Sequence, residues 1–325
     1  MRTILIFDTA LATSNVGDDI IMDAIDRNMR EVFDSGFSMR LATHVDNYSP
    51  LQLMKPIKKI GYFQNADLKF ICGTNLIQQK RLGKIHCQWA LYPHNVSLYT
   101  GSILVGVGTT DGGTRLDPLA EMLYRKVLSR NYIHSVRDEL TKQIVNHLGF
   151  RAINTGCPTL WEMTPEKCRE IPTGKASSCV ISVSGYDTQK DPARDRQMLE
   201  IVSQNYRQLT AWIQTSRDEE YLDSFPGTQE IRRIYNLKQY RELLRKEATD
   251  YVGTRLHGGV FALQNNCRSI VISIDHRAEG FQKSNNLPVV KRERIGEDLE
   301  RMINSDWKTE IRINEKAIKK FKGQF

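Results

Sequence analysis

The sequence lacks the features that mark secreted, membrane-spanning and metal-binding proteins. Only six of its 325 residues are cysteines, and they form no CxxC pair and no Cys/His set at zinc spacing. In a chain of this length, such cysteines are expected to be free thiols in a reducing compartment. No stretch approaches the roughly 18 apolar residues of a membrane helix, and the acidic residues do not cluster. We therefore expect a cytoplasmic protein with no metal and no cofactor.

The first residues resemble a secretion signal only briefly. Asp8 interrupts the apolar run that begins the chain, and a helical pattern follows directly. We interpret this run as the first strand of a sheet rather than as a targeting segment.

The charge of the chain is strongly positive, with a formal net charge of +8. Nucleic acid is not the expected partner, because the sequence has no recognition motif and no basic stripe interleaved with aromatic residues. An anionic small substrate fits the charge better, as does an anionic membrane surface that carries a lipid-linked acceptor. Residues 308–325 hold six basic and two acidic residues. This tail is either a solvated helix face that covers the first domain, or a peripheral contact with the membrane.

Short apolar strands alternate with amphipathic helices along the chain. Strands are expected at residues 2–8, 69–74, 102–108, 132–137, 151–156, 179–185, 208–214, 250–255 and 269–275. Apolar residues at helical spacing lie between most of them. This alternation is typical of parallel sheets with helices on both faces, and therefore of an α/β fold.

Residues 162–178 interrupt the alternation with two prolines, a glycine and a serine pair. We place a domain boundary there. The prediction is an N-terminal α/β domain over 1–164 that holds the acceptor side and Arg137, and a C-terminal α/β domain over 165–300 that holds the donor site. A helical tail over 301–325 is expected to pack back on the first domain. The two Rossmann-like domains are expected to face each other across a cleft, with ligands outside the carboxyl ends of the strands.

One strand end carries the strongest chemical signal. In GTRLHGG (253–259), Arg255 and His257 lie at a strand-to-helix turn. A helix N-terminus attracts anions, a guanidinium binds carboxylate or phosphate with two N–H groups, and an imidazole can donate a proton near neutral pH. The same residues would also suit a buried turn, in which Arg255 forms a structural ion pair and His257 is a satisfied core group.

Further polar motifs follow other strands. They are SNVGDD (14–19) with Asn15 and Asp18, CGTN (72–75) with Asn75, SVRD (135–138) with Arg137, and SIDHR (273–277) with Arg277. Each motif alone has a plain structural explanation, since Asp18 and Asp138 could cap helices and Asp275 could pair with Arg277 on the surface.

In their order along the chain, these motifs resemble the polysaccharide pyruvyl transferase family over about residues 5–282. SVRD and GTRLH are the specific elements, and GCPTL (156–160) stands where the family has an Asp-Pro or Cys-Pro turn. The chain departs from the family at Arg277, where many members have lysine, and at 72–74, where the family often has three glycines. The resemblance implies the two-domain fold of the glycosyltransferase B type.

The resemblance also implies a reaction and a set of residues. A pyruvyl group would move from phosphoenolpyruvate to a sugar of a surface polysaccharide or its precursor, forming a ketal and releasing phosphate. His257, Arg255 and Arg137 would be catalytic, with His257 as the general acid. These three and Arg277 would bind the donor. The residues for a nucleotide-, lipid- or polymer-linked acceptor would be Asn15, Asp18 and Asn75.

Two other functions are consistent with the motifs. One is a glycosyltransferase of the same architecture that uses a nucleotide sugar, although no nucleotide-base or ribose site stands out. The other is a non-catalytic carbohydrate-binding scaffold, which would have no reason to keep a costly cluster of cationic residues. The sequence leaves open the acceptor sugar, the stereochemistry of the ketal and the formation of a homo-oligomer.

Overall fold

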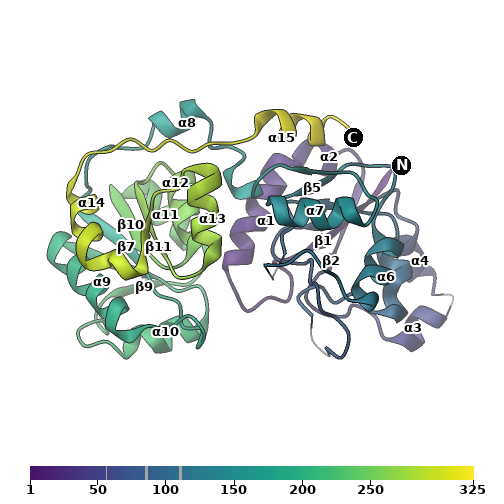
Figure 1. Ribbon diagram of the computed structural model, residues 1–325, viewed down its shortest axis with the longest axis horizontal. Helices are drawn as coiled ribbons and strands as arrows, with labels where there is room; N and C mark the ends of the chain where they lie inside the picture. The colour runs from purple at the N-terminus through teal and green to yellow at the C-terminus, as the bar shows by residue number, and fades with distance from the viewer. Residues whose placement is uncertain (56, 85–86, 110–111) are drawn as a thin grey trace. The chain divides into compact units, whose positions relative to one another are not determined.

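The computed structural model describes residues 1–55, 57–84, 87–109 and 112–325 (Figure 1). Contacts divide the chain into two compact units. The first consists of Met1–Thr13, Ile21–Trp161 and Asn314–Phe325, and the second of Ser14–Ile20 and Glu162–Ile313. The chain passes from the first unit to the second after Trp161, where the predicted linker (162–178) begins. Among the described residues, no helix is both long enough and apolar enough to cross a membrane.

The first unit is built on parallel strands. Its four-stranded sheet has the order β2-β1-β3-β4, and a two-stranded sheet pairs β5 with β6. The strands are β1 (Thr3–Asp8), β2 (Phe37–Ala42), β3 (Leu68–Cys72), β4 (Ser102–Val105), β5 (His134–Val136) and β6 (Ala152–Asn154). A parallel bridge from Val107 to Val136 connects the two sheets. The strand order reverses between β1 and β3.

Short helices surround these strands, and buried aromatic residues such as Phe7, Trp89 and Tyr124 fill the core. The helices are α2 (Arg30–Phe33), α3 (Pro50–Met54), α4 (Lys58–Gln64), η1 (Pro93–Asn95), α5 (Val96–Tyr99), α6 (Pro118–Val127), α7 (Glu139–His147), η2 (Pro158–Leu160) and α15 (Glu315–Lys322). Helix α1 (Gly17–Asn28) begins in the second unit and continues in the first. The C-terminal tail belongs to the first unit because Phe321 packs on Trp161 and Phe325 on Phe70.

The second unit contains one six-stranded parallel sheet with the order β12-β11-β10-β7-β8-β9. The strands are β7 (Ser178–Ser182), β8 (Gln208–Trp212), β9 (Arg232–Ile234), β10 (Thr249–Gly253), β11 (Ser269–Ser273) and β12 (Val289–Lys291). The chain builds the sheet outward from β7 in one direction and then from β10 in the other. The order therefore reverses between β7 and β10, as in a doubly wound Rossmann sheet.

Helices cover both faces of this sheet. The helices of this unit are α8 (Pro165–Arg169), α9 (Pro192–Asn205), α10 (Ser216–Asp223), α11 (Leu237–Lys246), α12 (Leu256–Gln264), α13 (His276–Asn285), η3 (Arg292–Arg294), η4 (Ile295–Leu299) and α14 (Glu300–Asn304). One face packs Ile181 and Val252 against Met198 of α9. On the other face, the Trp212 ring stacks on Tyr240 of α11 at 4.5 Å.

Candidate functional site at the carboxyl edge of the second sheet

The two central strands of the second sheet end beside each other, and the loops that follow them carry the predicted chemistry. Residues 183–186 follow β7, and residues 254–257 follow β10. In open parallel sheets, ligands bind outside the carboxyl ends of the strands at the point where the strand order reverses. The topology therefore places Arg255 and His257 at the expected ligand position of this sheet.

Ser182 and Tyr251 fix the backbone of the turn that contains Arg255. Ser182 Oγ accepts a hydrogen bond from the Arg255 N–H at 3.1 Å and lies 2.5 Å from the Tyr251 hydroxyl. That hydroxyl donates to the Arg255 carbonyl at 2.7 Å. A Cβ atom at Gly253 would lie 2.4 Å from Ser182 Oγ, so the close approach of β10 and β7 requires glycine there.

Arg255 is a buried member of an ion pair. It is 5% exposed, and its Nε donates to Asp218 Oδ2 at 2.9 Å. Its Nη2 contacts the other oxygen of the same carboxylate. The guanidinium carbon lies 4.6 Å from the centre of the Tyr186 ring. Of the two interpretations that the spacing left open for Arg255, the structure shows the ion pair.

Asp218 joins three of the loops at this edge. The carboxylate is fully buried, and it accepts hydrogen bonds from the backbone N–H groups of Gly185 at 2.9 Å, Thr215 at 3.2 Å and Gln214 at 3.3 Å. With Arg255, these contacts connect the loops after β7, β8 and β10. Such a set of donors compensates for the cost of burying a charge. Sequence reasoning missed Asp218, although it completes a capping box with Thr215 at the start of α10.

The N-terminal segment Ser14–Ile20 packs against the same edge. Gln214 Nε2 donates to Asn15 Oδ1 at 2.8 Å, and the Val16 N–H donates to the Gln214 carbonyl at 3.0 Å. Asn15 Oδ1 also accepts the Gly17 N–H at 3.0 Å. Asn15 is therefore held in the second unit. Helix α1 begins at Gly17, so Asp18 lies in its first turn, buried, rather than at the cap.

His257 and Arg277 lie in the first turns of two helices at this edge. Helix α12 begins at Leu256, two residues earlier than the sequence suggests, and His257 is half-buried in its first turn. Arg277 Nε and Nη2 both donate to Asp275 Oδ2, at 2.9 and 2.7 Å. Burial raises the pKa of Asp275, but the hydrogen bonds and charge of Arg277 outweigh it and hold that pKa below its usual range. This contact is the ion pair between Asp275 and Arg277 that the sequence allowed as a structural explanation of the motif.

In the first unit, the structure brings Arg137 and Asn75 together. Arg137 Nη2 donates to Asn75 Oδ1, so a predicted donor-binding residue contacts a predicted acceptor-binding residue. Asn75 follows two residues in left-handed conformation, Gly73 at φ 66° and Thr74 at φ 48°. It lies just after β3, one of the two strands between which the order of the first sheet reverses. Asp138 caps α7 by accepting the Thr141 N–H at 2.7 Å.

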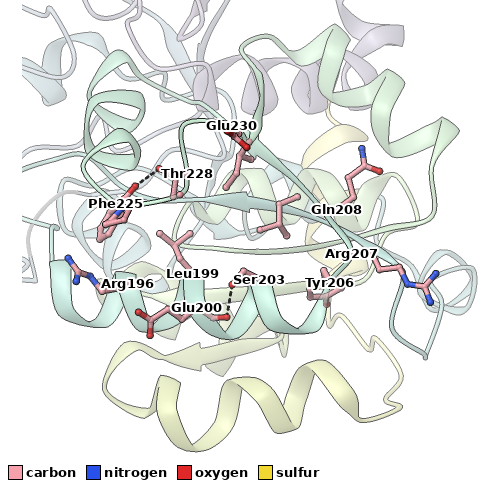
Figure 2. A pocket seen from close by; sticks show the side chains of 14 residues that line it. Arg196, Leu199, Glu200, Ser203, Tyr206, Arg207, Gln208, Phe225, Thr228 and Glu230 are labelled. Atoms are coloured by element: carbon pink, nitrogen blue, oxygen red, sulfur yellow. Dashed lines mark hydrogen bonds between the residues drawn. The ribbon is translucent and has the colours of Figure 1, made fainter.

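The second unit also has a pocket of about 590 Å³ that the sequence did not predict. Figure 2 shows Arg196, Leu199 and Glu200 along α9 on one side and Phe225 and Thr228 of the α10–β9 loop on the other. Gln208, the first residue of β8, also lines the pocket. The pocket is therefore at the amino end of β8, whereas the predicted motifs follow the carboxyl ends of strands. We take the carboxyl edge as the candidate site, because the cationic residues gather there.

The cysteines do not contribute reactive groups to this site. All six are buried, and none forms a disulfide. Burial raises the pKa of Cys267 to about 12 and the pKa of Cys179 well above its ordinary value, which disfavours the nucleophilic thiolate. Within the described parts of the chain, no group of three or more His, Cys, Asp or Glu side chains could hold a metal ion.

A known protein family matches the part of the chain that contains these motifs. Residues 15–276 match the model of the family described as polysaccharide pyruvyl transferase. The matched range includes every predicted site residue except Arg277. No curated protein matches the sequence significantly.

Two solved structures are similar in fold. One is the UDP-GlcNAc 2-epimerase of Methanocaldococcus jannaschii in complex with UDP-GlcNAc and UDP, with 11% identity, coverage of 98% of this chain and 97% of that chain, and a TM-score of 0.51. The other is MnaA of S. aureus with UDP, with 10% identity, coverage of 99% and 91%, and a TM-score of 0.53. At such low identity the likeness concerns the fold alone. It confirms the predicted α/β architecture with two Rossmann-like domains of the glycosyltransferase B type.

Proposed function

Because the chain belongs to the polysaccharide pyruvyl transferase family, we propose that it moves a pyruvyl group from phosphoenolpyruvate to a sugar of a surface polysaccharide or its precursor. The observation that carries this proposal is the position of GTRLH. The motif lies inside the matched range and follows β10, at the point where the order of the second sheet reverses. That is where an α/β sheet binds an anionic ligand.

The reaction adds a proton to the methylene carbon of phosphoenolpyruvate, which becomes a methyl group. A sugar hydroxyl attacks the adjacent carbon, which has oxocarbenium character, and gives up its proton. The bond from that carbon to the phosphate oxygen then breaks and releases inorganic phosphate. A second hydroxyl of the same sugar attacks the same carbon, loses its proton and completes the cyclic ketal. Of the two hydroxyl protons released, one balances the proton added to the methylene carbon and the other leaves on the inorganic phosphate. The protein must therefore supply a general acid and cations that hold a phosphate and a carboxylate.

We assign the general acid to His257, which lies in the first turn of α12, where a bound anion also meets the helix N-terminus. Arg277 is half-buried at the start of the neighbouring helix and supplies a cation for the donor. Arg255 contributes mainly as a positioning residue, since Asp218 holds its guanidinium. Arg137 belongs to the first unit, and its role toward the donor stays a prediction from the family resemblance.

We also propose that Asn15, Asp18 and Asn75 bind the acceptor. Asn15 and Asp18 lie in the segment that packs on the loop after β8, and Asn75 contacts Arg137. Amide groups donate and accept hydrogen bonds and carboxylates accept them, so both can bind sugar hydroxyls. Part of the hydrogen-bonding capacity of Asn15 and Asn75 is used within the protein.

A glycosyltransferase that uses a nucleotide sugar is the second candidate. It draws support from the fold that the chain shares with two proteins whose structures hold UDP. The two functions differ in what the enzyme consumes and releases. A pyruvyl transferase consumes phosphoenolpyruvate and releases inorganic phosphate, whereas a glycosyltransferase consumes a nucleotide sugar and releases the nucleotide. A turnover experiment therefore separates them.

The test supplies phosphoenolpyruvate with a panel of nucleotide-linked, lipid-linked and polymeric sugars and measures phosphate release and ketal formation. We expect one class of acceptor to give both products, and His257→Asn to lower the rate by about 10²–10⁴-fold. His147→Asn, at an exposed position on α7, is the matched control and should keep the wild-type rate. Release of a nucleotide from a sugar donor without consumption of phosphoenolpyruvate would contradict the proposal.

A further inference from the structure

The first unit has an exposed apolar surface on α3 and α4. The side chains of Leu51, Met54, Ile57 and Tyr62 are 72%, 81%, 39% and 58% exposed. Exposed apolar residues are ordinarily scattered singly over a protein surface. Here four lie within one short segment, and Figure 1 shows α3 and α4 at the outer edge of their unit. We call residues 51–55 and 57–62 the α3–α4 surface.

The α4 part of this surface is anchored in the core, whereas α3 has no buried residue and lies against η1. Ile60 is only 3% exposed, and the Phe63 ring packs against Tyr48 at 6.1 Å. Ser49 begins α3 with a capping box in which its hydroxyl and the Gln52 side chain each bond the other residue's backbone N–H. The packed side of α4 and the capping box of α3 therefore hold the two helices that carry the exposed apolar side chains.

The charge of the surface has one sign. Lys55, Lys58 and Lys59 are all exposed beside the apolar side chains. Between Asp46 and Asp67 the sequence contains no acidic residue. Apolar tips beside uncompensated lysines match a bilayer surface, where headgroup phosphates meet acyl chains. A tyrosine suits the same boundary, because its ring is apolar and its hydroxyl is polar.

We propose that the α3–α4 surface docks on a lipid bilayer with anionic headgroups. Leu51, Met54 and Ile57 enter the boundary between headgroups and acyl chains, and the three lysines pair with lipid phosphates. A second copy of the chain is a poorer occupant. In a two-fold interface the same patch meets itself, which would place these lysines against their own counterparts.

The C-terminal tail does not offer the same combination. Its helix α15 is basic, but its apolar residues Ile318 and Phe321 are 8% and 0% exposed because they pack into the first unit. Lys319 also pairs with Glu315 at 3.5 Å. The tail can attract anionic lipid but has no apolar side chains free to insert. The peripheral membrane contact that the sequence suggested for the tail is therefore assigned to the α3–α4 surface.

The test is sedimentation of the full chain with vesicles of phosphatidylcholine alone or mixed with phosphatidylglycerol. We expect binding to the mixed vesicles only. Replacing Lys55, Lys58 and Lys59 by glutamine should weaken binding about a hundredfold, since each lysine near an anionic surface contributes about fivefold. Leu51→Ser with Met54→Ser should weaken it at least about tenfold, because two apolar side chains no longer insert.

Two control variants distinguish binding through this surface from nonspecific hydrophobic binding and from binding through the tail. Leu82→Ser removes another apolar side chain, 70% exposed in the same unit, and should leave binding unchanged. Replacing Lys316, Lys319 and Lys320 of the tail by glutamine should weaken binding less than the α3–α4 lysine variant does. Each substituted side chain is exposed, so unchanged thermal unfolding is expected throughout.

Several results would overturn the proposal. They are an absence of binding by the wild type, equal binding to both kinds of vesicle, or loss of binding in the tail variant but not in the α3–α4 variants. A concentration-dependent dimer in solution that Leu51→Ser with Met54→Ser abolishes would instead assign the surface to a second copy. Binding to vesicles needs no phosphoenolpyruvate, so this test can fail while the proposed function stands, and the reverse also holds.

Discussion

At the scale of single residues, Asp218 determines how the candidate site is held. Its carboxylate accepts three backbone N–H groups and the Arg255 guanidinium in full burial. Arg255 was predictable from its motif, because a strand end and a helix start mark it in the sequence. Its partner was not, because Asp218 lies 37 residues away on another helix and local spacing carries no information about that contact.

We predict that Asp218→Asn lowers the free energy of unfolding by about 3–5 kcal/mol, because it leaves the buried Arg255 guanidinium without its counter-charge. Urea denaturation measures the change. Asp187→Asn is the control, since Asp187 pairs with Lys190 on the surface with 81% side-chain exposure and should change stability by less than about 0.5 kcal/mol. Equal stability of Asp218→Asn and the wild type would show that the ion pair contributes little.

A second residue-scale prediction concerns His134 on β5. Burial lowers its pKa from 6.5 to about 4. Its Nδ1 accepts the Leu104 N–H at 3.1 Å, and its Nε2 lies 2.9 Å from the Ser129 carbonyl, so the neutral ring is held in the fold. Between these two pKa values the unfolded chain binds more protons than the folded one. Stability must therefore fall as the pH falls from 6.5 towards 4.

The loss attributable to His134 is about 2 kcal/mol between pH 7.5 and pH 5. It is measured by denaturation of the wild type and of His134→Gln across this range. We expect the variant to be less stable at neutral pH but to lose about 2 kcal/mol less on acidification, and His147→Gln to follow the wild type. If His134→Gln and the wild type have the same pH dependence, another group is responsible.

At the scale of elements, glycines allow β10 and α12 to pack closely. We predict that Gly253→Ala destabilises the protein by about 1–3 kcal/mol, because the new Cβ would overlap the Ser182 side chain and backbone. Gly280→Ala is the matched control in α13, where nothing lies within 4 Å of a new Cβ. It should stabilise the protein by about 0.5–1 kcal/mol through helix propensity. Thermal unfolding of the two variants in opposite directions would agree with this packing, and a neutral Gly253→Ala would contradict it.

The strands that the sequence predicted are all present, and those it missed have a common physical character. Strands β9 (Arg232–Ile234) and β12 (Val289–Lys291) have three residues each and lie at the edges of the second sheet. Strand β2 (Phe37–Ala42) is an exposed edge of the first. Buried central strands have continuous apolar runs, whereas an edge strand can be polar and short. Periodicity therefore found the central strands and the fully buried edge strand β4 (Ser102–Val105), and it missed the edge strands β2, β9 and β12.

The site was predictable to the same degree. The motifs CGTN, SVRD, GTRLH and SIDHR lie at the carboxyl ends of β3, β5, β10 and β11, as the alternation of strands and helices predicted. The pairing of the polar side chains was not predictable, since Asn15 bonds Gln214 and Arg137 bonds Asn75 across 199 and 62 residues. These contacts depend on the fold as a whole and leave no local pattern.

At the scale of the whole molecule, the chain does not divide into units in sequence order. Ser14–Ile20 belongs to the second unit and Asn314–Phe325 to the first, so each unit is completed by a segment from the other end of the chain. The predicted acceptor residues Asn15 and Asp18 consequently share a unit with Arg255 and His257. Arg255, His257 and Arg277 also lie in this unit. Binding of phosphoenolpyruvate can therefore be measured before the acceptor sugar is known.

The most direct measurement is calorimetric titration of the full chain with phosphoenolpyruvate, beside a parallel titration with UDP-GlcNAc. His257→Asn is the variant of choice, because Arg255→Ala would leave Asp218 buried and unpaired and would confuse binding with stability. We predict one saturable site for phosphoenolpyruvate in the wild type and at least tenfold weaker binding in His257→Asn. No heat with phosphoenolpyruvate alongside saturable binding of UDP-GlcNAc would contradict the account and favour a nucleotide-sugar glycosyltransferase.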